Sequence, residues 1–136
     1  MKILAIEIGA RAIGVYALAR GESADNNDCP TADFLNELET NNEREWNQIN
    51  RYLGWSQDRF ITNKDQFKPI GDGLFEFRGH AGARLFCFQD GGALLLCTNG
   101  YVKKKQKLNP REIEKALAWK DAYFKAKETK TLLFVK

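Results

Sequence analysis

The stretch LFEFRGHAGARLFCFQDGGALLLCTNGYVKK, Leu74 to Lys104, decides the fold. It contains three strand-like runs, LFEFRG, ARLFCFQD and ALLLCTNGYVKK, which are rich in aromatic and branched residues. Short turns, HAG and GG, separate the runs. Runs of this composition with such short connections are typical of neighbouring antiparallel strands. The stretch therefore predicts an antiparallel β-meander.

Alternation along the first two runs places charged side chains on one face of the predicted sheet. Successive strand residues point to opposite faces, so Phe75 and Phe77 share one face while Glu76 and Arg78 share the other. Arg84 is in phase with Phe86 and Phe88 of the second run. One face of the meander must therefore carry charge near its edge.

Upstream of the meander, the runs KILAIEI and IGVYALAR predict an N-terminal hairpin. Two helices should follow, the first with Pro30 at its first position and the second opening with a capping box formed by Thr40 and Glu43. Gly54 is expected to end the second helix, and residues 55–73 should be irregular. Apolar residues recur at helical spacing in both helices: Phe34, Leu35 and Leu38, then Trp46, Ile49 and Leu53.

Downstream of the meander, the chain turns strongly basic before a last helix begins. The helix is predicted to open with Asn109 as cap, Pro110 at the first position and Glu112 completing a capping box. Residues 130–136 could form a further strand. We therefore expect one α+β domain over residues 1–136: an N-terminal strand or hairpin, two helices, an antiparallel β-meander and a C-terminal helix. The basic run consists of Lys103, Lys104, Lys105 and Lys107.

The composition of the 136 residues, 43% hydrophobic with three prolines, is poorly suited to a disordered or fibrous protein. Glu7 interrupts the apolar start, no signal-like cleavage site follows, and no run approaches the length of a membrane span, so we expect a cytoplasmic protein without membrane partners. The three cysteines and the single histidine lack metal-ligand spacing. We expect no metal and no cofactor.

Charge is distributed unevenly along the chain. Residues 1–63 carry six basic and ten acidic side chains, whereas residues 64–136 carry fifteen basic and eight acidic ones. The second half therefore holds a balance of +7 against −4 in the first. Such a basic half is expected to bind a polyanion.

The sequence contains no phosphate-binding glycine loop and no nucleophile motif, so phosphate chemistry would depend on side-chain cations. Arg78, Arg84 and the lysine run could converge on one phosphate if the strand register brings them level. That arrangement permits metal-free RNA cleavage: a base takes the proton of the ribose 2′-OH, the oxygen attacks phosphorus, cations stabilise the developing charge, and an acid protonates the leaving oxygen. Arginine suits the phosphate clamp, and neighbouring lysines favour one another's neutral form, which suits proton transfer.

Three of these assignments have plainer alternatives. His80 could act as a general base or be a polar turn residue. Tyr101 could stack on a nucleobase or simply cover the edge of the core. The lysine run could contact RNA, could be a solvated surface, or could protect an edge strand against aggregation.

Four segments together resemble the toxins of the RelE/HigB superfamily, particularly its phage-derived HigB-like branch: CPTADFLNEL, KPIGDGLFEFRG, ARLFCF and GYVKKKQKLNPREIEKAL. The resemblance covers roughly residues 13–127 in the expected order. It implies a toxin of a type II toxin–antitoxin pair, usually an endoribonuclease that cleaves mRNA on the ribosome. The implied partners are therefore mRNA, the ribosome and a cognate antitoxin, expected to be of the helix-turn-helix type.

The resemblance also assigns roles to individual residues. Arg78 and Arg84 match the basic strand positions, and the lysines match the strand-to-helix junction that contacts the scissile phosphate. We therefore expect Arg84, Lys103, Lys104 and His80 to be catalytic, and Arg78, Lys105, Lys107 and Tyr101 to bind RNA. MKILAIEIG and TLLFVK are additions to the usual pattern, and the C-terminal arginine and tyrosine of the RelE type have no clear counterpart. Other functions remain open: a gyrase poison of the ParE type, a phage host-interference factor, or an inactive binding scaffold.

Overall fold

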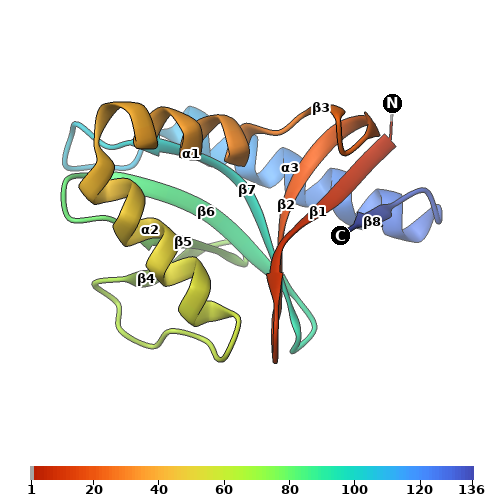
Figure 1. Cartoon of the computed structure of the whole chain (residues 1–136), viewed down its shortest axis with the longest axis horizontal. Coiled ribbons are helices and arrows are strands. Elements are labelled where there is room, and N and C mark those ends of the chain that lie inside the picture. Colours follow the sequence, from red (N-terminus) through yellow and green to blue (C-terminus); the bar gives the residue numbers. More distant parts are fainter. Residues whose placement is uncertain (1) are drawn as a thin grey trace.

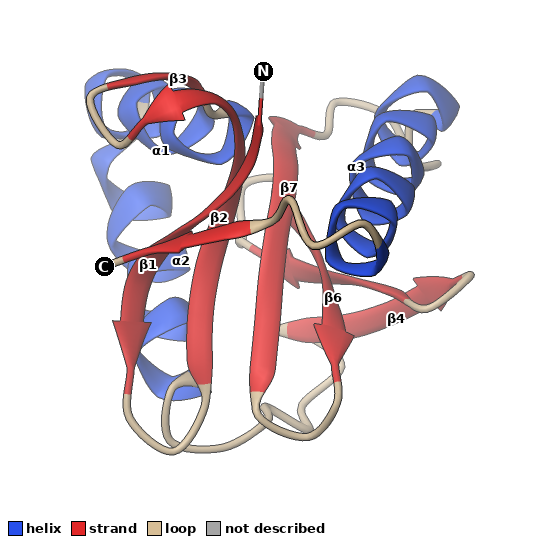
Figure 2. Ribbon diagram, turned by 90° about the vertical axis from the view of Figure 1, so that its right-hand side faces the viewer, coloured by secondary structure: helices blue, strands red, loops and turns tan. Residues whose placement is uncertain are grey.

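The computed structural model describes residues 2–136, which form three helices and one eight-stranded sheet. Helices α1 and α2 cover one face of the sheet and α3 covers the other (Figures 1 and 2). This arrangement confirms the predicted α+β class. In chain order the elements are β1 (Lys2–Ala10), β2 (Gly14–Ser23), β3 (Asn26–Asp28), α1 (Pro30–Asn41), α2 (Glu43–Ser56), β4 (Phe67–Gly71), β5 (Leu74–Arg78), β6 (Ala83–Asp90), β7 (Leu94–Val102), α3 (Pro110–Glu128) and β8 (Leu133–Val135).

The predicted meander is present as β5, β6 and β7, which pair antiparallel in sequence order. The N-terminal hairpin of β1 and β2 is also confirmed. It joins the meander through a parallel pairing of β2 with β7, in which Val15 lies opposite Leu95. The sheet order is β4-β5-β6-β7-β2-β1-β8, with β3 pairing to β2 beside this path.

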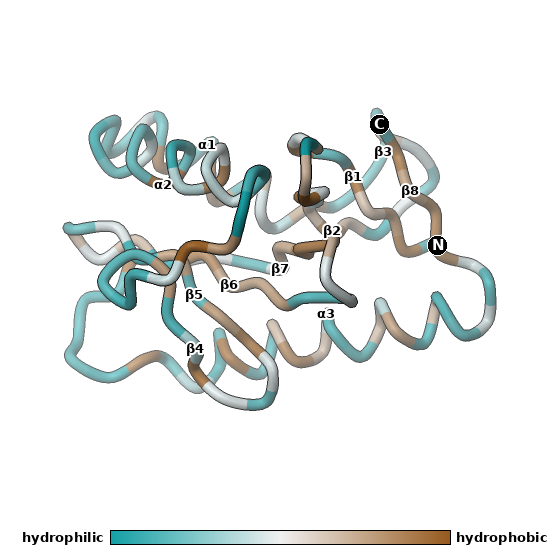
Figure 3. Tube along the Cα trace, turned by 90° about the horizontal axis from the view of Figure 1, so that it is seen from below, coloured by the Kyte–Doolittle hydropathy of each residue, from teal (hydrophilic) through white to brown (hydrophobic). Residues whose placement is uncertain are grey.

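Both faces of the central strands are buried, so the sheet separates two apolar layers. On one face, Leu85 and Cys87 of β6 pack with Phe34 of α1 and Leu53 of α2. On the other face, Phe86 and Phe88 pack with Ala116, Trp119 and Tyr123 of α3. The trace is accordingly hydrophobic along much of β6 and β7 (Figure 3). Alternate residues of one strand thus pack against helices on opposite faces of the sheet.

Three local predictions were wrong. Strand β4 lies within the segment expected to be irregular, where it pairs antiparallel with β5 at the sheet edge. Helix α2 continues past Gly54 to Ser56. Its cap is Asn42, whose side chain accepts a hydrogen bond from the Glu45 amide, whereas the Thr40 hydroxyl bonds back to the Asn36 carbonyl within α1.

The last helix begins as predicted at Asn109 and Pro110, and the Asn109 side chain accepts a hydrogen bond from the Arg111 amide. The expected capping box does not close, because the Glu112 carboxylate pairs instead with Lys115. After α3, strand β8 pairs in parallel with β1, so the two additions to the family pattern contact each other. Within residues 2–136, no helix combines the length and apolar character needed to span a membrane.

Candidate functional site

The candidate site begins at the turn between β5 and β6, which α2 holds in place. The carboxylate of Glu45, itself 4% exposed, accepts hydrogen bonds from the backbone amides of Ala81 and Ala83 at 2.9 and 3.0 Å. The side-chain oxygen of Gln48 accepts a third, from the His80 amide at 2.8 Å. A buried carboxylate that satisfies two backbone donors is a strong local constraint. Helix α2 therefore determines where the turn and His80 lie.

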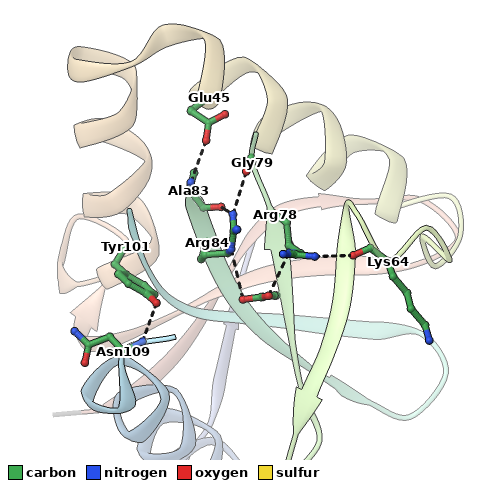
Figure 4. Close-up of polar contacts among 9 residues, drawn as sticks. Glu45, Lys64, Arg78, Gly79, Ala83, Arg84, Tyr101 and Asn109 are labelled. Carbon is green, nitrogen blue, oxygen red and sulfur yellow. Dashed lines mark hydrogen bonds and ion pairs between the residues drawn. The ribbon is translucent and has the colours of Figure 1, made fainter. Parts of the chain in front are cut away.

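Arg78 and Arg84 face each other across this hairpin, directly opposite in register. Arg84 Nη1 donates to the carbonyl oxygens of Gly79 and Ala83, and Arg78 Nη1 donates to the carbonyl oxygen of Lys64 (Figure 4). Both guanidinium groups thus have one end tied to the backbone. The orientation of each guanidinium group is therefore fixed before any ligand binds.

Glu76 forms an ion pair with each arginine, at 3.4 Å to Arg78 Nε and 3.8 Å to Arg84 Nε. The two Nε atoms and Glu76 Oε2 are buried without a hydrogen-bond partner among the described residues. Burial raises the pKa of Glu76 above its ordinary value, while the charges of Arg84, Arg78, Lys103 and Lys68 act in the opposite direction. Burial likewise lowers the pKa of Arg84, and Glu76 opposes that shift. The cluster is held by proximity of charge more than by directed hydrogen bonds.

The arginines open onto a polar hollow of about 490 Å³. Arg78, Arg84 and His80 all line it, so the structure brings together three of the predicted site residues. Tyr52 of α2 and residues of the loop before β4 complete the wall: Asn63, Asp65 and Gln66. We call this space the cation hollow.

Tyr101 lies on the next strand, β7, and Lys103 directly follows the end of that strand. Tyr101 pairs in register with Arg84, and its hydroxyl accepts a hydrogen bond from the Asn109 amide at 2.9 Å (Figure 4). Lys103 donates its backbone amide to the Gly82 carbonyl, and its side chain is close enough to influence the Glu76 carboxylate. Lys103 therefore belongs with the arginines, whereas the Tyr101 hydroxyl is occupied at the start of α3.

The remaining lysines do not gather there. Lys104 lines a separate hollow beside α1, together with Phe34, Glu37 and Leu38. Lys105 and Lys107 are exposed in the connection between β7 and α3. The lysine run therefore splits between two sides of the sheet and the solvent, and does not act as one cluster.

Residues 33–121 match the family described as Phage derived protein Gp49-like (DUF891). The chain belongs to this family. It is a RelE-like, toxin-type family found in toxin–antitoxin systems. The matched residues run from α1 into α3 and contain the whole arginine hairpin and the lysine run. No curated protein matches the sequence.

The Gp49-like match leaves out the N-terminal hairpin and β8, although β2 lies in the middle of the sheet. The matched residues supply both arginines, Glu76, Glu45 and the loop that closes the cation hollow. The residues outside the match supply β1, β2, β3 and β8, which extend the sheet away from β4. The candidate site is thus made within the Gp49-like segment alone.

Sequence reasoning missed several residues that shape this site. Glu45 resembled an ordinary acidic residue in a first helical turn, and only the tertiary contact reveals that it accepts from the β5–β6 turn. Gln48, Asn63 and Gln66 carried no periodic or motif signal. Strand alternation does not account for the separation of Lys103 from Lys104, because both follow Val102, the last residue of β7.

Within the described residues, no group of three His, Cys, Asp or Glu side chains could hold a metal ion. The groups that line the cation hollow can bind an anion through fixed guanidinium groups and can transfer protons through nearby titratable side chains. His80 is the only histidine of the sequence. It is exposed and lines the cation hollow together with both arginines.

Proposed function

We propose that this Gp49-like protein is the toxin of a type II toxin–antitoxin pair and cleaves mRNA as a metal-independent endoribonuclease on the translating ribosome. The observation that carries the proposal is the cation hollow, where Arg78, Arg84 and His80 line one open polar space. Membership of a toxin-type family supports it. The cognate antitoxin, expected to be a helix-turn-helix protein, would neutralise the toxin by binding.

In this mechanism the two arginines hold the scissile phosphate. Their backbone hydrogen bonds keep them in place, so the charge that develops on the phosphate oxygens meets preorganised donors. His80 takes the 2′-OH proton or protonates the leaving 5′ oxygen, and Lys103 adds a third cation from the end of the neighbouring strand. Glu76 is only 3% exposed. Its ion pairs with Arg78 and Arg84 hold the two guanidinium groups close together.

The remaining predicted residues have outer roles in this proposal. Lys105 and Lys107 extend the positive surface toward the RNA backbone, and Tyr101 supports the strand-to-helix junction through its bond to Asn109. Lys104 lies beside α1 and contacts a different part of the substrate or of the ribosome.

The test compares four chains expressed from an inducible promoter: wild type, His80→Ala, Lys103→Ala and the control Lys125→Ala. Lys125 is an exposed lysine near the end of α3, so its loss changes net charge without touching the hollow. Wild type and the control should arrest growth and cleave transcripts in the presence of chelator. His80→Ala and Lys103→Ala should each lower cleavage by roughly 10²-fold or more, the usual scale for a lost proton-transfer or oxyanion-stabilising group. Intact transcripts in the wild type would overturn the proposal.

A second function, a non-nucleolytic interaction protein such as a gyrase poison or phage host-interference factor, is favoured by one observation. The Tyr101 hydroxyl and Arg84 Nη1 are already bonded within the protein, and Glu76 offsets part of the arginine charge. The same induction distinguishes the two functions. DNA damage with intact RNA would support the gyrase poison, and growth arrest with neither would support host interference.

A further inference from the structure

A second hollow, of about 650 Å³, adjoins the cation hollow. It is lined by Trp55 at the end of α2 and by the loop that follows, including Arg59, Phe60 and Ile61. Asn63 and Gln66 line both spaces, so the two share one wall. We call this second space the aromatic hollow.

Trp55 is the most conspicuous side chain of the aromatic hollow because 47% of it is exposed. An indole this exposed offers a large, flat apolar surface on which a ring can stack. Its ring lies 5.8 Å from that of Tyr52, which lines the cation hollow. The two aromatic rings thus connect one hollow to the other.

The polar groups of the aromatic hollow suit a ligand that combines a flat ring with a hydrogen-bonding edge. The side-chain amide of Gln66 forms no hydrogen bond among the described residues and offers both a donor and an acceptor. Asp58 would repel a phosphate, but its carboxylate is paired with Arg11 at 2.6 Å, and the hydrogen bond from Arg11 lowers its pKa. Arg59 has no ion-pair partner among the described residues.

The loop between α2 and β4 is fastened to the cation hollow. Arg78 Nη1 donates to the Lys64 carbonyl at 3.2 Å, and the Arg78 amide donates to the Gln66 carbonyl at 2.8 Å. Phe60 and Ile61 pack against the core beneath α2. The same arginine that would hold a phosphate therefore also positions the loop that forms the aromatic hollow.

We propose that the aromatic hollow is a nucleobase subsite for the nucleotide next to the scissile phosphate, with Trp55 stacking on the base and Gln66 contacting its edge. The proposal rests on the function proposed above. Stacking on an exposed aromatic ring accepts any base, because every base has a π face. Contacts to the edge distinguish one base from another, so Gln66 supplies whatever preference the site has.

The test uses 2′-O-methyl oligoribonucleotides, which lack the nucleophile and bind without being cleaved. Binding to wild type is followed by tryptophan fluorescence and by an independent gel or anisotropy titration with each of the four homopolymers. Trp55→Ala should weaken binding roughly tenfold and abolish the fluorescence change, since base–aromatic stacking is typically of that size. Gln66→Leu should retain affinity and reduce the differences among the four bases.

The matched control is Phe134→Ala, which removes another exposed aromatic, on β8 at the opposite end of the sheet order. It should bind as wild type does. The proposal would be overturned if Trp55→Ala bound the oligonucleotides with wild-type affinity and gave the wild-type fluorescence change, in titrations carried to millimolar oligonucleotide.

This outcome is separable from the failure of the proposed function. Transcript cleavage that persists at wild-type efficiency in Trp55→Ala, and with unaltered base preference in Gln66→Leu, would reject the subsite and leave the nuclease standing. Trp55-dependent binding in a wild type that cleaves nothing would reject the nuclease and retain a nucleobase site.

Discussion

Individual residues in this protein often satisfy a structural and a functional demand at once. Glu45 illustrates this. It is a buried residue of α2, and its carboxylate accepts hydrogen bonds from two backbone amides of the β5–β6 hairpin. Glu76 is also buried, and it forms ion pairs with both arginines of the cation hollow. Substituting such residues is expected to alter both stability and the geometry of the hollow.

Glu45→Ala should lower the free energy of unfolding by about 2–4 kcal/mol, because two backbone amides, of which that of Ala83 is buried, lose a charged acceptor. Glu45→Gln should cost less, since one oxygen accepts both bonds and an amide oxygen can replace it. Urea titration measures both. Glu43→Ala, at an exposed position of the same helix, is the control and should stay within about 1 kcal/mol of wild type. A loss in Glu45→Ala no larger than in Glu43→Ala would contradict this role.

At the scale of elements, polar side-chain bonds fasten the C-terminal half of α3 to the end of β6. Tyr123 is fully buried against Phe88, and its hydroxyl donates to Asp90 at the end of β6 at 2.6 Å. Lys127 donates to the same carboxylate at 2.8 Å. Burial acts to raise the pKa of Asp90, but the hydrogen bonds from Lys127 and Tyr123 outweigh it, so the net pKa is lowered.

This attachment predicts a pH dependence. Because the pKa of Asp90 is lower in the folded state, its stabilising contribution is present above the unfolded value of about 3.9 and is lost as pH falls through the folded pKa. Asp90→Asn should therefore be less stable than wild type at neutral pH, by about 1–2 kcal/mol. The difference should shrink below about pH 4, as measured by thermal unfolding from pH 7 to pH 2. A difference that is constant with pH would contradict the assignment.

Elements with strong local signals were predicted from the sequence, and those that depend on distant contacts were not. The meander was predictable because its aromatic and branched runs are separated by turns too short for anything but hairpins. Strand β4 was missed because Pro69 interrupts a short run, and a proline is tolerated there only because β4 is an edge strand. The cap at Asn42 was missed because Thr40 and Glu43 offered an equally good local pattern.

At the scale of the whole molecule, the excess of basic residues in the second half does not form one surface. The fold separates Lys103, beside the arginines, from Lys104, beside α1, although they are neighbours in sequence. The sequence could predict that the arginines share a hairpin, because their alternation is local. It could not predict that the loop before β4 would close the hollow, since no motif links residues 63–66 to the turn.

The separation can be measured by the salt dependence of RNA binding. Each phosphate contact to a single strand contributes about 0.7 to the slope of log affinity against log salt. Lys103→Ala should therefore reduce the slope for a short 2′-O-methyl oligonucleotide by about 0.7, whereas Lys104→Ala should leave it nearly unchanged. Equal reductions in both variants would mean that the lysines act together, contrary to their placement.

The parallel pairing of β8 with β1 has a consequence for biosynthesis. Leu133 to Val135 are translated after the other strands of the sheet, yet they lie against Leu4 to Ile6, which are translated long before them. Until β8 is made, the outer edge of β1 therefore has unpaired backbone N–H and C=O groups. Such an edge can pair with the strands of other nascent chains. The sheet is complete, and this edge of β1 is protected, only after β8 has left the exit tunnel.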